Sequence, residues 1–174
     1  MSNLTQTTKS GDASGRGSVA GYRVNFPARM RSYTEAEIEA VVNVMRNSEV
    51  QTQGDCMRKF EADFKAYIGA NHAFAVDNAT NALRLAAILC KFQDGDEVIL
   101  PGYTFSATAI PFVMTGVKLV FADIDPKRWT IDPKDIEKKI TPHTKAIIAV
   151  HLLGMPADMP TIMEIAKKHN LRVI

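Results

Sequence analysis

The stretch AFAVDNATNALRLAAILCKFQDGDEVILPGYTF, from Ala73 to Phe105, decides the fold. It predicts a short apolar strand at Ala73–Val76, a polar turn at Asp77–Thr80 and then a helix. The first N–H groups of a helix have no internal partners, and the helix dipole places partial positive charge there. A strand that delivers a small polar turn to a helix N-terminus therefore predicts an anion site, most often a phosphate site.

A second strand in this stretch, Glu97–Leu100, is followed directly by the sequence Pro-Gly-Tyr-Thr-Phe. This places the ring of Phe105 at the carboxyl edge of the strand. In parallel sheets the functional loops follow the carboxyl ends of the strands. A phosphate site and an aromatic ring at one edge together indicate a flat, phosphorylated cofactor.

The rest of the chain predicts an α/β fold, with a parallel-rich sheet and flanking helices. Short apolar segments rich in Val and Ile alternate with segments of helical character, which is typical of a parallel sheet covered on both faces. The expected strands are Ala73–Val76, Glu97–Leu100, Lys118–Ala122, Ala146–Val150 and Leu171–Ile174. The expected helices are Thr80–Phe92, Phe105–Thr115, Pro133–Ile140 and Asp158–His169.

Upstream of the sheet, the sequence predicts two amphipathic helices that face the core. The first begins at Thr34, where Glu37 completes a capping box. The second ends at Gly69, a residue suited to a left-handed C-cap. Their apolar residues recur at helical spacing. The helix at Thr80–Phe92 is apolar on more than one face, so we expect it to lie between the sheet and another surface, such as a second subunit.

The chain divides into a tail, residues 1–21, and a folded part, residues 22–174. The tail is rich in Gly and Ser and has no apolar period, so we expect it to be disordered. It lacks the continuous apolar core of a signal peptide. No segment has the ~18 apolar residues that a membrane helix needs.

Composition excludes several classes of function. The net charge is +2, and Lys and Arg are scattered rather than clustered, which argues against nucleic acid as a partner. No metal-ligand spacing links the four His residues, so we expect no metal. Cys56 and Cys90 lie far apart in the sequence, which fits a reduced, cytoplasmic protein.

The chain ends at Ile174, inside what reads as a buried strand. Domains rarely end in this way, because termini are usually polar and lie at the surface. We therefore expect residues 22–174 to be the N-terminal part of a larger protein.

Four segments in order resemble one known family. They are QGDCMRKFEADFKAYIGANHAFAVDNATNAL, GDEVILPGYTFSATA, GVKLVFADIDPKRWTID and TKAIIAVHLLGMPADM. The family is the DegT/DnrJ/StrS group of sugar aminotransferases, which use pyridoxal 5′-phosphate and have the aspartate-aminotransferase type of fold (fold type I). The resemblance covers about residue 22 to the end. It implies that the chain is the N-terminal part of the large domain of such an enzyme.

The resemblance implies cofactor-binding roles for Ala79, Thr80, Asn81 and Phe105. Backbone N–H groups and the Thr80 hydroxyl would hold the phosphate, and Phe105 would stack on the ring. The family usually has Gly where this chain has Ala79. If the site needs a positive φ, Ala costs on the order of 1 kcal/mol, whereas ordinary helical backbone costs nothing. The alternatives are a plain helix cap and a core Phe.

Three further residues lie at the same expected edge. His151 is a candidate for substrate binding, with a structural role as the alternative. Asp123 and Asp125 form an Asp-x-Asp-Pro pattern, and paired carboxylates can bind metal or perform acid–base chemistry. The sequence favours a turn there, because Pro126 follows.

No catalytic residue is assigned within the chain. Transamination needs a Schiff-base Lys and an acid that keeps the pyridine nitrogen protonated. The resemblance implies that both lie beyond residue 174, so we expect the isolated chain to be inactive.

The resemblance implies a homodimer that moves an amino group, from glutamate or a similar amino-acid donor, to a nucleotide-linked keto sugar. Such reactions belong to polysaccharide and related sugar biosynthesis. Three alternatives remain: a sugar dehydratase with the same cofactor and fold, a non-catalytic cofactor-binding or regulatory remnant, and a nicotinamide-dependent Rossmann enzyme. The last is disfavoured because no strand is followed by G-x-G-x-x-G.

Overall fold

The computed structural model describes residues 33–50 and 52–174. The expected disordered tail, residues 1–21, lies outside the described residues. The chain divides at Gly54 into two compact units, the second of which, Asp55–Ile174, contains the whole sheet.

The first unit contains helix α1 (Glu35–Asn47), whose predicted capping box is confirmed. The Thr34 N–H donates to Glu37 Oε2 at 2.6 Å, and the Glu37 N–H donates to Thr34 Oγ1 at 3.3 Å. The predicted core-facing role is not borne out, because no residue of α1 is buried. The apolar residues Ile38, Val41 and Met45 of α1 are exposed.

The second unit begins with helix α2 (Asp55–Ile68). The predicted left-handed cap is confirmed, with Gly69 at φ 67°. The apolar stripe of α2 is again not buried, against our expectation. Ala73–Val76 is not a strand, which corrects another prediction. No described strand pairs with it, and the Ala75 N–H donates instead to the Glu61 carboxylate at 2.8 Å. An isolated strand cannot satisfy its own backbone groups, so this segment forms no ladder.

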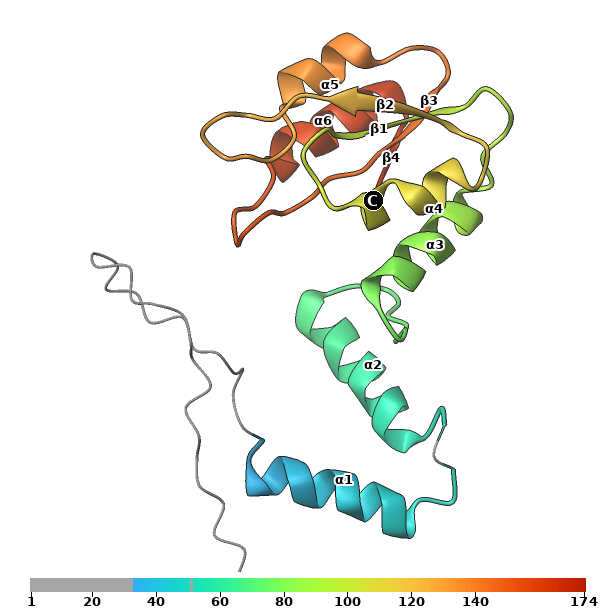
Figure 1. Ribbon diagram of the computed structural model, residues 1–174, viewed down its shortest axis with the longest axis vertical. Helices are drawn as coiled ribbons and strands as arrows, with labels where there is room; N and C mark the ends of the chain where they lie inside the picture. The colour runs from blue at the N-terminus through green and yellow to red at the C-terminus, as the bar shows by residue number, and fades with distance from the viewer. Residues whose placement is uncertain (1–32, 51) are drawn as a thin grey trace, which may run out of the picture. The chain divides into compact units, whose positions relative to one another are not determined.

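The sheet has four parallel strands in the order β2-β1-β3-β4 (Figure 1). The strands are β1 (Glu97–Pro101), β2 (Lys118–Ala122), β3 (Thr144–Ile147) and β4 (Arg172–Val173). All four strands match predicted ones, and β3 and β4 are shorter than expected. Beyond the end of β3, the Ile148 N–H still donates to the Ile99 carbonyl at 2.8 Å. The α/β fold class with a parallel sheet is therefore confirmed.

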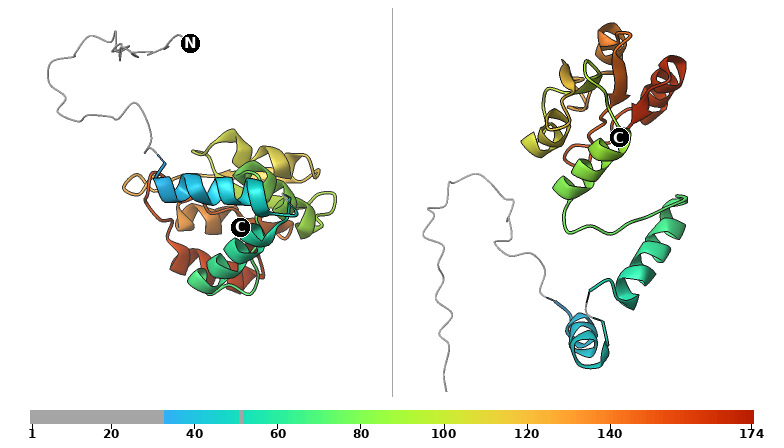
Figure 2. Two further views of the ribbon diagram at one scale, coloured as in Figure 1. Left: turned by 90° about the horizontal axis from the view of Figure 1, so that it is seen from below. Right: turned by 90° about the vertical axis from the view of Figure 1, so that its right-hand side faces the viewer.

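Helices cover both faces of this sheet. Figure 2, right, shows α4 in yellow and α6 in red on opposite sides of the strands. The helices are α3 (Ala79–Cys90), α4 (Ile110–Val113), α5 (Pro133–Lys139) and α6 (Met159–His169). Alternate residues of β1 and β3 point to opposite faces, as strand geometry requires.

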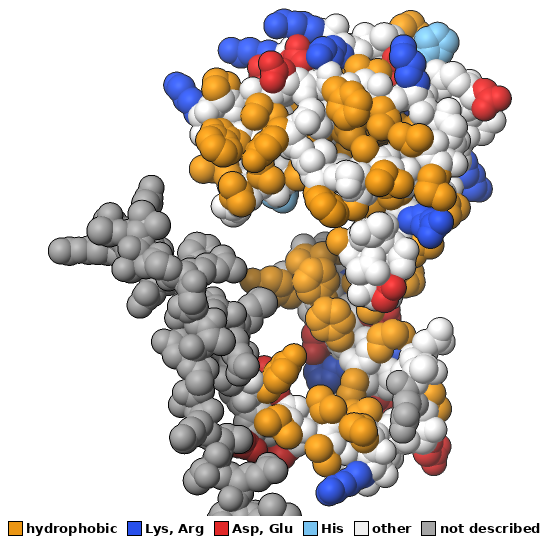
Figure 3. Space-filling view, in the orientation of Figure 1, with side chains coloured by type: hydrophobic (Ala, Val, Ile, Leu, Met, Phe, Trp, Pro, Cys, Tyr) orange, Lys and Arg blue, Asp and Glu red, His pale blue; other side chains and the backbone are white. Residues whose placement is uncertain are grey.

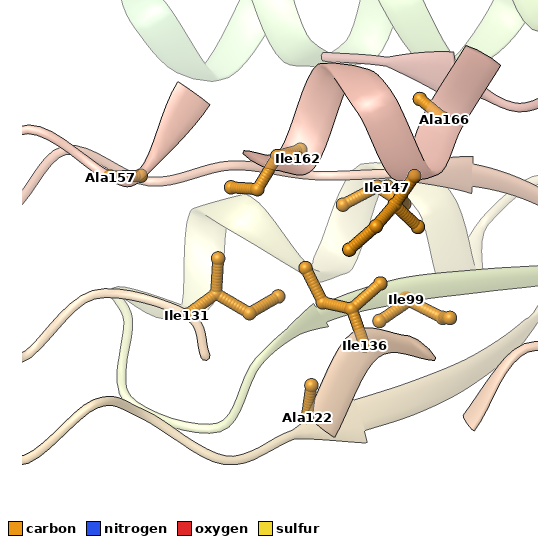
Figure 4. Close-up of a cluster of buried hydrophobic side chains, with 9 residues drawn as sticks. Ile99, Ala122, Ile131, Ile136, Ile147, Ala157, Ile162 and Ala166 are labelled. Atoms are coloured by element: carbon orange, nitrogen blue, oxygen red, sulfur yellow. The ribbon is translucent and has the colours of Figure 1, made fainter. Parts of the chain in front are cut away.

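Each face of the sheet has its own hydrophobic core. One core packs Ile99 and Ile147 against α5 and α6, through side chains such as Ile136 and Ile162 (Figure 4). The other packs Val98, Leu100, Ala146 and Ile148 against Ala87 of α3 and Phe112 of α4. Residues 98–100 of β1 are fully buried, which explains their near-continuous apolar sequence.

The predicted helix Phe105–Thr115 is divided into two short pieces. A 3₁₀ turn, η1 (Ser106–Thr108), precedes α4, and Pro111 lies in the first turn of α4. Proline has no N–H and favours the start of a helix, so a new helix begins here rather than continuing η1.

The outer side of strand β2 carries polar contacts from helix α5. Lys139 Nζ donates to the Phe121 carbonyl at 2.7 Å, and the Asp123 N–H donates to Asp135 Oδ2 at 2.7 Å. The pKa of the Asp135 carboxyl is lowered by the Asp123 N–H and then by Lys139. These side chains satisfy backbone groups that face away from β1.

Candidate cofactor-binding site

The strand order places a topological switch point between β1 and β3 at the carboxyl edge of the sheet. The chain leaves β1 through α4 on one face and leaves β3 for α6 on the other face. The two loops therefore diverge, which is the topological switch point where ligands of open α/β sheets bind. Phe105 follows β1 and His151 follows β3, so both lie on the loops at this switch point.

The N-terminus of α3 has the features of the predicted anion site. Asn78 is the N-cap, and its side chain accepts from the Asn81 N–H at 2.9 Å. The helix ends at the opposite edge, where Arg172 at the start of β4 donates to the Cys90 carbonyl. The C-terminal end of α3 thus lies at the amino edge, and its N-terminus points away from that edge. Helix α3 also contacts η1, the turn that follows Phe105.

The two central residues of the turn are suited to a phosphate. Ala79 is the first residue of α3, and its φ is not positive. The replacement of the family's usual Gly therefore imposes no backbone strain. Thr80 is exposed, and its hydroxyl has no hydrogen-bond partner among the described residues. The backbone N–H groups of the first helical turn and this hydroxyl can donate to an anion.

Asp77 supports this turn, a role that the sequence analysis missed. Its carboxylate accepts from Asn81 Nδ2 at 2.8 and 3.0 Å and from Asn78 Nδ2 at 3.0 Å. Asn81 is thereby bound through both its backbone and its side chain. Asp at the start of a turn, followed by two Asn residues, is the signal that could have revealed it.

Phe105 is 77% exposed, which excludes the alternative of a core Phe. Its backbone is extended, with φ −73° and ψ 142°, and its side chain forms no cap. In the space-filling view, hydrophobic side chains form patches on the surface of the sheet-bearing unit (Figure 3). An exposed ring at this edge can pack on the flat face of a ligand.

His151 has a structural contact. Its Nδ1 accepts from the Ala157 N–H at 3.0 Å, which closes the loop between β3 and α6. Inside this loop, Leu152 and Met155 pair through two backbone hydrogen bonds, with Leu153 at φ 51° and Gly154 at φ 81°. The contact supports the structural alternative, although the ring is exposed at the edge that carries Phe105.

Asp125 forms a turn, as the sequence favoured. Asp125 Oδ1 accepts from the N–H groups of Lys127 at 2.7 Å and Arg128 at 3.0 Å. These two donors lower the pKa of the Asp125 carboxyl. Asp123 Oδ1 accepts from the Ile124 N–H at 2.8 Å. Residues 33–50 and 52–174 contain no group of three or more acidic, His or Cys side chains that could hold a metal ion.

A second feature that sequence analysis missed is an aromatic pair at the carboxyl edge. The rings of Tyr103 and Trp129 meet edge to face, with centroids 6.3 Å apart and an interplanar angle of 77°. Tyr103 follows β1 and Trp129 follows β2. The position of Trp129 beside the Asp-x-Asp turn was a signal that it lies at this edge.

The amino edge of the sheet has a different chemistry. Glu97, at the start of β1, is 5% exposed. Its carboxylate binds Lys118 Nζ at 2.7 Å and the Thr141 hydroxyl at 2.6 Å. These two hydrogen bonds, that of Lys118 first, hold the pKa of Glu97 below its usual 4.5. A surface hollow of about 480 Å³ lies nearby, lined by residues that include Lys145 and His169 and by none of the candidate site residues.

The fold and the site define a class of protein: an open, parallel α/β domain with a phosphate-suited helix N-terminus and an exposed aromatic ring after a central strand. The sequence profile of the DegT/DnrJ/EryC1/StrS aminotransferase family matches residues 31–174. The chain belongs to this family, as the resemblance implied.

Individual relatives agree with this assignment. A "Pleiotropic regulatory protein" of Geobacillus stearothermophilus is 44% identical over 138 residues, which are 79% of this chain and 37% of the relative. A UDP-N-acetyl-3-dehydro-alpha-D-glucosamine 3-aminotransferase of Acidithiobacillus ferrooxidans is 46% identical over 121 residues, 70% of this chain and 33% of that enzyme. The chain therefore spans about a third of the length of these relatives.

A solved structure confirms the fold type and the family's cofactor. The Escherichia coli GDP-4-keto-6-deoxy-D-mannose-3-dehydratase with bound hydrated PLP superimposes with a TM-score of 0.79 and 27% identity, over 87% of this chain and 40% of the dehydratase. Pyridoxal phosphate is thus the cofactor of the family, and the fold is that of fold-type-I enzymes. Among the described residues, none of the helices combines the length and the apolar character that crossing a bilayer requires.

Proposed function

We propose that the protein containing this chain is a pyridoxal-phosphate-dependent aminotransferase that transfers an amino group, from glutamate or a similar donor, to a nucleotide-linked keto sugar. The observation that carries the proposal is the switch point, with the exposed Phe105 on the loop after β1 and with α3 in contact with η1, the turn that follows Phe105. Family membership and the similarity to a sugar-nucleotide aminotransferase support it.

In this proposal, residues of the chain hold the cofactor. The Thr80 hydroxyl and the N–H groups of Ala79 and Thr80 donate to the phosphate, and Phe105 packs against the ring. Asn81, whose N–H donates to Asn78 Oδ1, holds the turn in shape. Asp77 keeps the turn in place through Asn81. The bound cofactor supplies an electron sink for the transfer of the amino group. The chain's own contribution is to bind and orient this group.

The site is tested by spectroscopic titration of the full-length protein that contains this chain, with the cofactor removed. Phe105→Ala removes the stacking surface and should weaken binding of pyridoxal phosphate, with Phe105→Tyr as the control that keeps the ring. Glutamate should then yield 2-oxoglutarate, and a nucleotide-linked keto sugar should gain an amino group, detected by mass spectrometry. If Phe105→Ala bound the cofactor with unchanged affinity, Phe105 would not be part of the site. Release of ammonia without amination of the sugar would contradict the proposed reaction.

Two other functions are favoured by specific relatives. The similarity to a dehydratase with bound PLP supports loss of water from a keto sugar in the same site. The similarity to a regulatory protein supports a non-catalytic role. The same assay distinguishes them. A dehydratase consumes glutamate, as the glutamate adduct of PLP trapped in a related dehydratase indicates, but yields a dehydrated sugar with no new amino group. A regulatory protein changes neither substrate.

The proposal extends to assembly and location. Helix α3 is buried at Ala87 and Cys90, whereas Leu85, Ile88 and Leu89 are exposed. This uncovered apolar face supports a homodimer, as expected for a helix that is apolar on more than one side. The free thiols of Cys56 and Cys90 support a cytoplasmic location. Sedimentation of the full-length protein tests the dimer.

A further inference from the structure

The aromatic pair Tyr103–Trp129 joins two loops at the carboxyl edge of the sheet. Each residue is 52% exposed, so neither belongs to the hydrophobic core. Their rings nevertheless meet in the edge-to-face geometry that aromatic pairs favour, with centroids 6.3 Å apart. The contact connects the loop after β1, which carries Phe105, to the loop after β2.

The turn that carries Trp129 is held firmly. The Trp129 N–H donates to the Asp125 carbonyl at 2.7 Å, and the Asp125 N–H donates to the Thr130 carbonyl at 2.9 Å. The next residues, Thr130 and Ile131, are buried. The backbone of Trp129 is left-handed, with φ 61°. Such a conformation in a bulky residue persists only where the surroundings determine it, and it recurs at functional sites.

The loop that carries Phe105 has few other restraints. The Gly102 N–H donates to the Ala122 carbonyl at 2.9 Å, and the hydroxyls of Thr104 and Thr108 are 2.8 Å apart. The Phe105 carbonyl accepts from the Thr108 N–H at 2.9 Å, whereas the Phe105 side chain is mostly exposed and makes no capping hydrogen bond. The side chain of Tyr103, two residues away, is thus the point at which this loop is braced from the side, by Trp129.

We infer that Trp129 is a positioning residue for the cofactor ring. It braces Tyr103, and through the short segment Tyr103–Phe105 it fixes the plane of the Phe105 ring. The firm turn and its left-handed backbone serve to present the indole to Tyr103. This inference rests on the proposed function, because it requires Phe105 to face the cofactor.

The test uses the full-length protein with Trp129→Gly, Trp129→Phe and Tyr103→Leu. Glycine removes the indole and accepts the positive φ, so the turn remains unstrained. We expect Trp129→Gly to weaken cofactor binding about twofold to tenfold, the range that corresponds to one aromatic pair. At saturating cofactor, the circular dichroism of the bound pyridine ring should also decrease, because the ring is less firmly oriented. Trp129→Phe should restore most of both signals.

A double-mutant cycle separates this role from general destabilisation. Tyr103→Leu should cause the same loss as Trp129→Gly, and the double variant should lose no more than either single variant. Tyr103→Leu carries the test if Trp129→Gly fails to fold. Additive losses, or wild-type affinity and dichroism in the single variants, would overturn the inference. If Phe105→Ala leaves cofactor binding unchanged, the proposed site itself fails, which is a different outcome.

Discussion

The two edges of the sheet are stabilised in different ways. At the amino edge, Glu97 is buried with two hydrogen-bond partners, and the left-handed residues Lys91 and Asn170 are the C-caps of α3 and α6. At the carboxyl edge, aromatic rings are exposed, and the left-handed residues are the bulky Trp129 and Leu153. Left-handed bulky residues and the exposed aromatic rings of Tyr103, Phe105 and Trp129 thus occur together at the carboxyl edge, which indicates that this edge is adapted for binding and the other for stability.

The largest expected effect concerns the reaction itself. The 174-residue chain, expressed alone, should show no half-transamination with glutamate, because the roles that we propose for its residues hold the cofactor and none of its lysines is assigned as the Schiff base. The measurement is release of 2-oxoglutarate, together with mass-spectrometric mapping of cofactor on lysines after reduction. One lysine that takes up one equivalent and supports the reaction would contradict the division between binding and reactive parts.

At the amino edge, Glu97→Gln should lower the free energy of unfolding by about 1.5–3 kcal/mol, the range for a hydrogen bond to a charged group. Urea denaturation of the full-length protein measures it, with the exposed Glu164→Gln of α6 as the control. Cofactor affinity should not change. An equal loss of cofactor affinity would show that the two edges are not independent.

The same variant has a defined pH dependence. Because the folded-state pKa of Glu97 is lowered, its stabilisation is fully present above the usual value of 4.5 and is lost as the pH falls through the lowered value. The difference in stability between wild type and Glu97→Gln should therefore shrink on acidification. A difference that grows at acid pH would contradict the assignment.

At the carboxyl edge, Thr80→Val preserves shape and removes the hydroxyl. It should weaken cofactor binding by about 1–3 kcal/mol, since a hydrogen bond to a charged phosphate is lost. The near-ultraviolet and visible absorption of the bound cofactor reports the affinity. Thr80→Ser keeps the hydroxyl and should bind the cofactor with wild-type affinity. If Thr80→Ser lost as much cofactor affinity as Thr80→Val, the hydroxyl would be excluded as the cause.

The smallest expected effect is a gain in stability. Leu153 is 85% exposed and has φ 51°, so Leu153→Gly removes a backbone strain without loss of packing. After the entropic cost of glycine, we expect about 0.5–1 kcal/mol of added stability in urea denaturation. Leu153→Ala retains the strain and should gain nothing. A gain in both variants would point to the side chain rather than the backbone.

The sequence predicted the parallel sheet because β1, β2 and β3 are apolar runs bounded by turns, a local signal. It failed at Ala73–Val76, because strand formation depends on a partner that composition cannot reveal. It also failed at Pro111, whose missing N–H outweighed the helical pattern of the segment. The stripes of α1 and α2 marked an apolar face correctly but not what covers it.

For the candidate site, the sequence predicted residues at strand ends and helix starts, since topology alone carries them to one edge. Phe105 follows strand β1 as this rule requires, whereas Thr80 follows a segment that forms no strand. The contact of Tyr103 with Trp129 joins residues from different loops, and the role of Asp77 depends on side-chain geometry. Neither follows from periodicity or spacing, so both required the three-dimensional arrangement.

The contacts between α5 and the outer side of β2 have a consequence for how copies of the chain meet. An edge strand presents free N–H and C=O groups that can template another strand and so begin aggregation. Here the Phe121 carbonyl accepts from Lys139 Nζ, and the Asp123 N–H donates to Asp135 Oδ2. Two backbone groups of the edge strand are therefore already hydrogen-bonded and cannot pair with an incoming strand. Helix α5 therefore opposes edge-to-edge association of sheets, in addition to covering the core.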